Sequence, residues 1–147
     1  MVYPGNSGSL IFLDENFAPR EFVKVSEGLY ENKSLRAKLV VENNLSTISF
    51  DSGKIYSFND AGKIAKIADK NGNNLTFQYD EEKKLIKTID TLGREINYMY
   101  NADSRLQEIV DFTGKKVIFG YSEAGDLVTI KIGNEANPRT ISFEYIT

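Results

Sequence analysis

The 147-residue sequence contains no histidine and no cysteine. The chain therefore lacks Ser–His and Cys–His catalytic machinery, histidine-ligated zinc and the side chain that ordinarily titrates near neutral pH. It also lacks a disulfide framework, so a secreted or surface location would have to be tolerated by the fold alone. No glycosidase context or phosphate loop is recognisable either. These absences predict a protein that is not an enzyme and that uses no cofactor.

An excess of positive charge and long apolar runs are also missing. The chain has 18 Lys and Arg against 21 Asp and Glu, a net charge of −3, which leaves no electrostatic footprint for nucleic acid. No apolar run approaches the roughly 20 residues of a membrane span, and the N-terminus lacks the basic leader of a signal peptide. We expect no nucleic-acid partner and no membrane insertion. We also expect a chain that is either part of a longer polypeptide or exported by another route.

What the sequence does contain is a repeat with a step of 21 residues. Aromatic doublets, apolar residues, aspartates and glycines each keep this register. The doublets are Tyr56/Phe58, Phe77/Tyr79, Tyr98/Tyr100 and Phe119/Tyr121; the other positions are Ile64, Leu85, Leu106 and Leu127, then Asp69, Asp90 and Asp111, then Gly72, Gly93 and Gly114. A fixed step of this size is typical of stacked supersecondary units.

Each unit is predicted to be a β-hairpin. Apolar runs lie between two clusters of turn residues, Asp69–Gly72 and Asp80–Lys83. The segment Leu75–Tyr79 alternates apolar and polar residues, as a strand with one buried face does. The first half of the unit breaks this alternation, because Ile64 and Ile67 are three residues apart. This spacing predicts a bend or β-bulge there.

The pattern resembles the Rhs or YD-repeat family, whose units run roughly as Gly-Arg-Leu, Asp-x-x-Gly-Arg and Tyr-x-Tyr-Asp. The matching segments are Gly62-Lys63-Ile64, Asp69-Lys-Asn-Gly72-Asn73, Phe77-Gln-Tyr79-Asp80, Asp90-Thr-Leu-Gly93-Arg94, Tyr98-Met-Tyr100-Asn101, Arg105-Leu106, Asp111-Phe-Thr-Gly114-Lys115 and Phe119-Gly-Tyr121. The resemblance covers about Ile48 to Tyr145. It departs from the family where Lys83 and Ser104 replace the turn glycine, and in an irregular final unit with three extra residues before Phe143.

This resemblance implies an all-β fold in which antiparallel hairpins stack into a curved, solenoid-like sheet. Rhs repeats in bacterial polymorphic toxins and insecticidal toxin complexes, and similar repeats in teneurins, wind into hollow shells. The resemblance therefore implies a shell segment that encapsulates or presents a C-terminal toxin or effector, secreted or at the bacterial cell surface. Its partners would be the remainder of a larger polypeptide or its toxin cargo.

Residues 1–47 lack the repeat register but still show strand patterns. Residues 10–13 and 22–25 are short apolar runs bounded by turn residues, and residues 35–42 alternate. For the last segment we favour a strand over a helix capped by Ser34. These strands are expected to extend the sheet and cover its first edge. Because no linker is visible, we predict a single β domain over residues 1–147, with non-repeat strands in 1–47 and repeats in 48–147.

The recurring residues also allow functional interpretations. Asp69, Asp90 and Asp111 could form a carboxylate ladder for Ca²⁺ or acid–base work, but we interpret each as an acceptor for backbone N–H groups of its own turn. The aromatic doublets could stack sugars. Their spacing instead suits packing, and we predict that Tyr79, Tyr100 and Tyr121 stack between successive units. The sequence thus predicts no catalytic, cofactor or metal site.

Two further functions remain open at this point. The chain could be a cell-surface adhesion module that binds carbohydrate or protein through an exposed face. It could also self-associate, because an open stack of hairpins leaves unpaired N–H and C=O groups at two edges.

Overall fold

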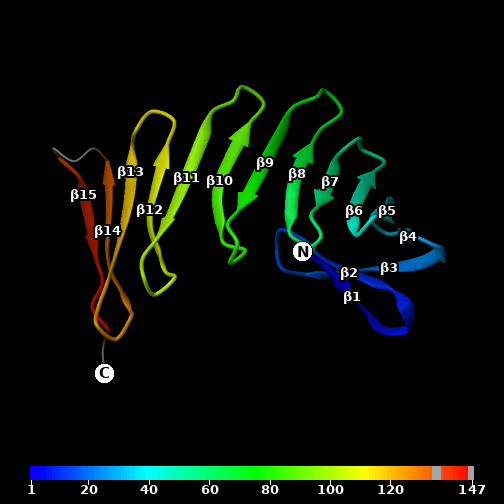
Figure 1. Cartoon of the computed structure of the whole chain (residues 1–147), viewed down its shortest axis with the longest axis horizontal. Coiled ribbons are helices and arrows are strands. Elements are labelled where there is room, and N and C mark those ends of the chain that lie inside the picture. Colours follow the sequence, from blue (N-terminus) through cyan, green and yellow to red (C-terminus); the bar gives the residue numbers. More distant parts are fainter. Residues whose placement is uncertain (134–136, 146–147) are drawn as a thin grey trace. The chain divides into compact units, whose positions relative to one another are not determined.

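The computed structural model of the chain describes residues 1–133 and 137–145, and its regular structure is almost entirely β. The strands are β1 Val2–Pro4, β2 Leu10–Leu13, β3 Pro19–Ser26, β4 Leu29–Asn32, β5 Ala37–Glu42, β6 Leu45–Phe50, β7 Ile55–Phe58, β8 Ile64–Ala68, β9 Asn74–Tyr79, β10 Leu85–Asp90, β11 Glu95–Tyr100, β12 Leu106–Asp111, β13 Lys116–Tyr121, β14 Leu127–Gly133 and β15 Arg139–Ser142 (Figure 1). A short 3-10 turn, η1 Asn6–Gly8, follows β1. In the described ranges, no helix is long and apolar enough to span a membrane. The predicted all-β class is confirmed.

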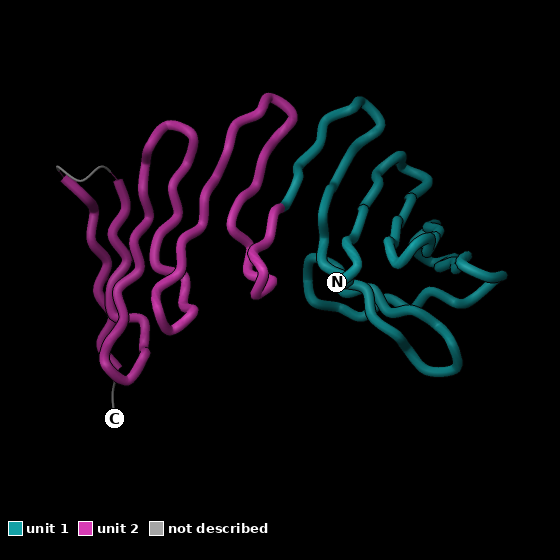
Figure 2. Tube along the Cα trace, viewed as in Figure 1, with its two compact units in different colours: residues 1–77 teal, residues 78–147 magenta. Residues whose placement is uncertain are grey.

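The chain divides into two compact units, Met1–Phe77 and Gln78–Thr147, and the boundary falls inside β9 (Figure 2). In unit 1, each strand from β1 to β8 pairs antiparallel with the next strand along the chain. In unit 2, the strands from β10 to β15 pair in the same way. The predicted array of antiparallel hairpins is therefore confirmed.

The repeat hairpins form because their turns share the same backbone chemistry. At the turn that begins with Asp90, the N–H of Gly93 donates to the carbonyl of Asp90 at 2.9 Å, and the N–H of Asp90 donates to the carbonyl of Arg94 at 3.1 Å. Gly93 has a φ of 76°, in the left-handed region that closes this type of short hairpin loop. Lys83 and Ser104 occupy the same position in alternate turns with φ of 64° and 61°, so these departures from the family pattern keep its geometry.

β-Bulges lie where the three-residue spacing predicts them. Tyr100 pairs with Leu106, but Met99 pairs with Glu108, which leaves Gln107 as the extra residue of β12. Equivalent register shifts occur between Ser57 and Phe58 and between Gly120 and Tyr121. Each bulge returns the next apolar residue of its strand to the face of the aromatic doublet.

The enclosed hydrophobic core lies in unit 1. Its buried apolar residues are Phe12, Phe22, Ala37, Leu39, Ile48, Tyr56 and Phe58. The N-terminal strands complete this core, since the Phe12 ring packs 5.7 Å from Tyr56 and 5.9 Å from Phe58, centroid to centroid. The N–H of Val2 also donates to the carbonyl of Gly62 at 3.0 Å. The β1–β2 hairpin thus covers a face of the sheet, whereas the sequence had predicted cover for an edge.

The predicted N-terminal strands are confirmed as β2, β3 and β5, and the predicted strand over residues 35–42 begins only at Ala37. The preceding residue, Arg36, has a φ of 50°, which is incompatible with a strand. A helix over this segment is excluded by the pairing of β5 with both β4 and β6.

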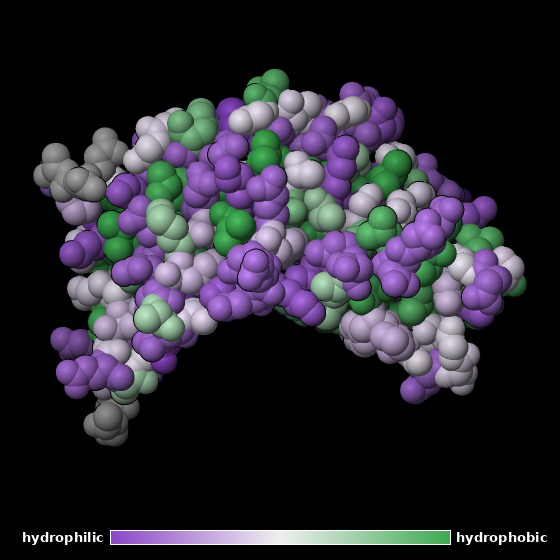
Figure 3. Space-filling model, in the orientation of Figure 1, coloured by the Kyte–Doolittle hydropathy of each residue, from purple (hydrophilic) through white to green (hydrophobic). Residues whose placement is uncertain are grey.

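Unit 2 has no comparable core. Among its described residues Thr88 alone is buried, and the other side chains are half-buried or exposed. The face drawn in Figure 3 shows apolar and polar residues intermixed over the surface. In unit 2 the strand hydrogen bonds and cross-strand contacts, more than an enclosed core, must therefore maintain the structure.

Candidate functional site

The recurring aspartates each hold their own turn. Asp90 Oδ1 accepts hydrogen bonds from the N–H of Leu92 at 2.9 Å and of Arg94 at 3.0 Å. Asp69 and Asp111 accept the same pair of bonds from the residues two and four positions ahead. The interpretation of these residues as turn acceptors is confirmed. Within residues 1–133 and 137–145, no group of three acidic side chains lies close enough to hold a metal ion.

The same contacts keep these carboxyl groups ionised. The Arg94 side chain, followed by backbone donors, lowers the pKa of Asp90 below its ordinary value. The pKa of Asp69 is lowered chiefly by the side-chain amide of Asn73, and that of Asp111 chiefly by the Thr113 hydroxyl. A catalytic acid needs a carboxyl whose pKa is raised toward neutrality. The turn aspartates therefore have the electrostatics of structural acceptors.

The tyrosine at the second position of the doublet fastens the open end of its hairpin. The hydroxyl of Tyr100 donates to the carbonyl of Leu85 at 2.9 Å, and that of Tyr121 donates to Leu106 at 2.6 Å, each fifteen residues earlier. Tyr145 makes the equivalent bond to Leu127 at 2.8 Å across eighteen residues, so the three extra residues of the final unit do not prevent it. Part of that insertion, residues 134–136, lies outside the described residues. The β10–β11 and β12–β13 hairpins are thus closed by an Asp turn at one end and by a tyrosine hydroxyl at the other.

A positively charged side chain lies over the ring of Tyr100 and another over the ring of Tyr121. Lys84 Nζ is 5.3 Å from the centroid of Tyr100, and the guanidinium carbon of Arg105 is 5.7 Å from that of Tyr121. The sequence analysis did not predict this contact. The signal was present, because Lys63, Lys84 and Arg105 share the 21-residue register. These contacts explain the Arg-Leu pair of the repeat motif. The Arg or Lys side chain covers the tyrosine ring, and the carbonyl of the following Leu accepts a hydrogen bond from the tyrosine hydroxyl.

The predicted stacking of Tyr100 and Tyr121 between units is not observed. Equivalent positions in successive units lie two strands apart, about 9.6 Å, which exceeds the distance at which rings make contact. Ring contacts occur in unit 1 instead, where Phe12 meets Tyr56 and Phe58, and Phe50 meets Tyr56. The first members of the doublets in unit 2, Tyr98 and Phe119, are half-buried.

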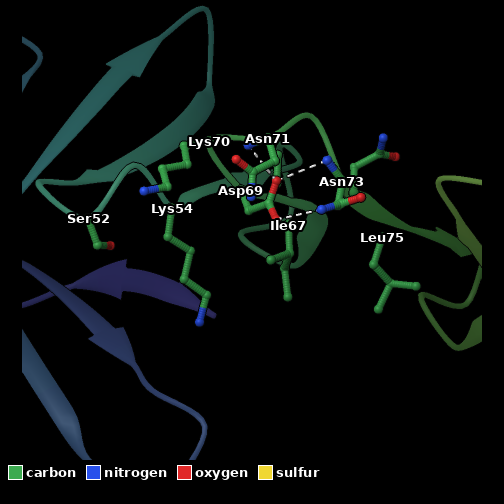
Figure 4. A pocket seen from close by; sticks show the side chains of 10 residues that line it. Ser52, Lys54, Ile67, Asp69, Lys70, Asn71, Asn73 and Leu75 are labelled. Carbon is green, nitrogen blue, oxygen red and sulfur yellow. Dashed lines mark hydrogen bonds between the residues drawn. The ribbon is translucent and has the colours of Figure 1, made fainter.

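Unit 1 also has a shallow pocket that the sequence did not predict (Figure 4). Its lining residues are Ser52, Lys54, Ile67, Ala68, Asp69, Lys70, Asn71, Asn73, Asn74 and Leu75. The Asp69 carboxylate points toward Asn73 and accepts a hydrogen bond from Asn73 Nδ2 at 2.8 Å. The side chains of Lys54 and Lys70 extend away from this carboxylate. Ammonium and amide donors around apolar Ile67 and Leu75 suit an acidic or polyhydroxyl ligand. The pocket lies between the turn that contains Ser52 and the turn that begins with Asp69. Local sequence periodicity does not predict which turns lie next to each other.

The comparison with known proteins agrees with this geometry. The sequence model of the Teneurin YD-shell family matches residues 41–146. No curated protein matches the chain at a significant level. The matched segment contains all the aromatic doublets, the three turn aspartates and the tyrosines whose hydroxyls fasten the hairpins. The chain therefore belongs to the Teneurin YD-shell family.

Proposed function

We propose that the chain is a non-catalytic wall segment of a YD-type shell that encapsulates or presents a C-terminal toxin or effector of the same polypeptide. Family membership supports a structural shell role. The observation that carries the proposal is the double fastening of the β10–β11 and β12–β13 hairpins, by an Asp turn at one end and a tyrosine hydroxyl at the other. The recurring aspartates and tyrosine hydroxyls thus form hydrogen bonds within the hairpins of the shell wall.

Location and partners follow from the same proposal. A shell of this type works outside the cell or at the bacterial cell surface, and its partners are the remainder of the larger polypeptide and the cargo. The exposed edge strand β15, in which all four residues are exposed, is the surface through which neighbouring strands would join. The same edge also supports self-association of isolated copies.

Limited proteolysis of the complete polypeptide that contains this chain tests the shell role. The segment that follows the repeats should survive protease concentrations that digest the same segment expressed alone. A matched variant with Tyr100→Ala and Tyr121→Ala, which removes two fasteners, should expose it. An array that is followed by no further domain, or a following segment that is digested equally in both contexts, would contradict the shell proposal.

The pocket of Figure 4 favours a second candidate function, a surface module that binds acidic or neutral glycans. Binding of the isolated chain to a glycan array, followed by titration calorimetry with any hit, tests this function. Lys54→Ala and Lys70→Ala should weaken such binding, whereas Lys131→Ala on β14 serves as a control of equal charge. Binding that is absent, or unaffected by the two pocket substitutions, would exclude the pocket as a glycan site.

A further inference from the structure

Unit 1 contains a docking site for a β-hairpin. The site consists of Tyr56, Phe58, Ile64 and Ile67, and the β1–β2 hairpin lies on it. The Phe12 ring packs against the rings of both Tyr56 and Phe58, and the N–H of Val2 donates to the carbonyl of Gly62 in the adjacent turn. With the hairpin in place, Phe58 is only 2% exposed.

This four-residue site recurs twice in unit 2 with the same strand register. In unit 1, Phe58 pairs with Ile64 and Tyr56 with Ile67, with a bulge between the two pairs. The first copy pairs Tyr100 with Leu106 and Tyr98 with Ile109; the second pairs Tyr121 with Leu127 and Phe119 with Ile130. Because register and bulge are the same, the side chains project from the sheet in the same arrangement.

In unit 2, however, these sites are not sealed by a hairpin. The aromatic and aliphatic residues of both copies are half-buried, unlike Tyr56 and Phe58. Neighbouring apolar residues on the same face are more exposed still, with Ile132 at 42% and Phe143 at 39%. Ile132 belongs to this face because it pairs with Val117, two residues from Phe119.

We propose that the face formed by Tyr98, Tyr100, Leu106 and Ile109 and by Phe119, Tyr121, Leu127 and Ile130 binds an uncharged, aromatic-bearing β-segment of another polypeptide. The β1–β2 hairpin shows the chemistry of the occupant: Phe12 is flanked by aliphatic Leu10 and Val2, and residues 1–13 contain no charged side chain. An uncharged segment also suits the rim, because Lys84 and Arg105 are already paired with Glu82 and Asp103.

The test uses the whole chain and a synthetic peptide with the sequence of residues 1–13. The peptide is titrated into isotope-labelled protein, and backbone amide shifts are followed by NMR. We expect saturable shifts at Tyr98, Tyr100, Phe119 and Tyr121 and unchanged signals for Leu39 and Ile48. A peptide carrying Phe12→Ser is the matched control and should produce no saturable shift.

Two measurements on the protein localise the binding. Tyr98→Ser with Phe119→Ser should weaken peptide binding at least tenfold. If that variant does not fold, a nitroxide attached to the peptide should broaden the same amides of the unmodified chain. The proposal is overturned by an absence of saturable shifts, or by shifts confined to unit 1 or to the β15 edge. Concentration-dependent shifts without peptide that block its binding would identify a second copy as the occupant and would also overturn it.

Discussion

At the scale of single residues, the tyrosine that ends the doublet in unit 2, Tyr100 or Tyr121, explains most of the repeat motif. Its hydroxyl bonds to a main-chain carbonyl of the partner strand, and its ring carries a Lys or Arg. The sequence predicted where these tyrosines recur but assigned them to stacking. The 21-residue step shows which residues occupy equivalent positions in successive units. The hydrogen-bond acceptor of Tyr100, however, is Leu85, which occupies a different position in the repeat. Register alone does not reveal such a contact.

Removal of the hydroxyl should therefore destabilise the hairpin. Tyr100→Phe and Tyr121→Phe should each lower the free energy of unfolding by about 1 kcal/mol, since a part-buried hydrogen bond is lost and the ring is kept. Urea denaturation measures the change. Tyr145→Phe is the control: this residue is 58% exposed, so water can replace the bond and the effect should be smaller. Equal stability of all three variants and the parent chain would show that the hydroxyls do not fasten the hairpins.

The turn aspartates predict an acid-sensitive stability. The pKa of Asp90 is lowered in the folded chain, first by Arg94, so the folded state binds this proton less tightly than the unfolded state. The stabilisation is fully present above the ordinary value of 3.8 and is lost as the pH falls through the lowered pKa. Asp90→Asn should have a mild effect at pH 7, because the amide oxygen still accepts the turn bonds.

Urea midpoints measured from neutral pH to below the ordinary Asp pKa check this prediction. The parent chain should lose stability over the acidic part of the range, and Asp90→Asn should lose less. Asp126→Asn is the matched control, because at this turn Ser122 Oγ, and not a carboxylate, accepts the backbone N–H of Asp126 at 3.1 Å. An identical acid dependence for the parent chain and Asp90→Asn would contradict the role of the ionised carboxylate.

At the scale of elements, the hairpin is the part of the structure that the sequence predicted best. Alternation in residues 75–79 gives β9, and the three-residue spacing of Ile64 and Ile67 gives the bulge of β8. The 21-residue step extends the bulge to β12 and β14. These features depend on local patterns. The placement of the β1–β2 hairpin on Tyr56 and Phe58 was missed because it joins segments far apart in the sequence, and the pocket was missed for the same reason.

Two substitutions at the turn position with positive φ, one that removes a glycine and one that introduces a glycine, should change the stability with opposite signs. Gly93 has a φ of 76°, and nothing lies within 4 Å of an added Cβ, so Gly93→Ala tests backbone conformation alone. It should destabilise the chain by about 1 kcal/mol. Ser104→Gly should have the opposite sign, up to about 1 kcal/mol, because it relieves a non-glycine residue in the left-handed region.

Thermal unfolding of both variants against the parent chain measures these effects. Ser104 receives only a long contact of 3.4 Å from Lys84 Nζ, so little is lost with its side chain. Stabilisation by Gly93→Ala, or destabilisation by Ser104→Gly, would mean that the turn geometry differs from the one described.

At the scale of the whole molecule, the two units differ in how they are stabilised. Unit 1 encloses a core around Phe22, Leu39 and Ile48, which are fully buried, whereas the apolar side chains of unit 2 remain half-buried or exposed. Composition and periodicity did not reveal this difference, because the same doublets occur in both units. What differs is the presence of the N-terminal hairpin over one of them.

Core substitutions should therefore cost more in unit 1. Phe22→Ala should lower its stability by about 3–5 kcal/mol, the range for a fully buried phenylalanine. Phe119→Ala should cost only about 1–2 kcal/mol, since its ring is half-buried and less apolar surface is lost. Native-state hydrogen exchange measures each unit separately: amides of Leu39 and Ile48 should be the better protected, and those of Tyr98 and Phe119 the less protected. Equal costs and equal protection would contradict the contrast between the units.

The bond between Val2 and Gly62 has a consequence for the order of folding. Every hairpin pairs neighbours along the chain and can form as soon as its residues are available, but the first strand must close a long loop before it finds its place. During synthesis residues 1–13 leave the ribosome before residues 55–68, on which they dock. In this interval the Phe12 ring lacks its contacts with Tyr56 and Phe58, and the exposed apolar surface favours aggregation of the nascent chain.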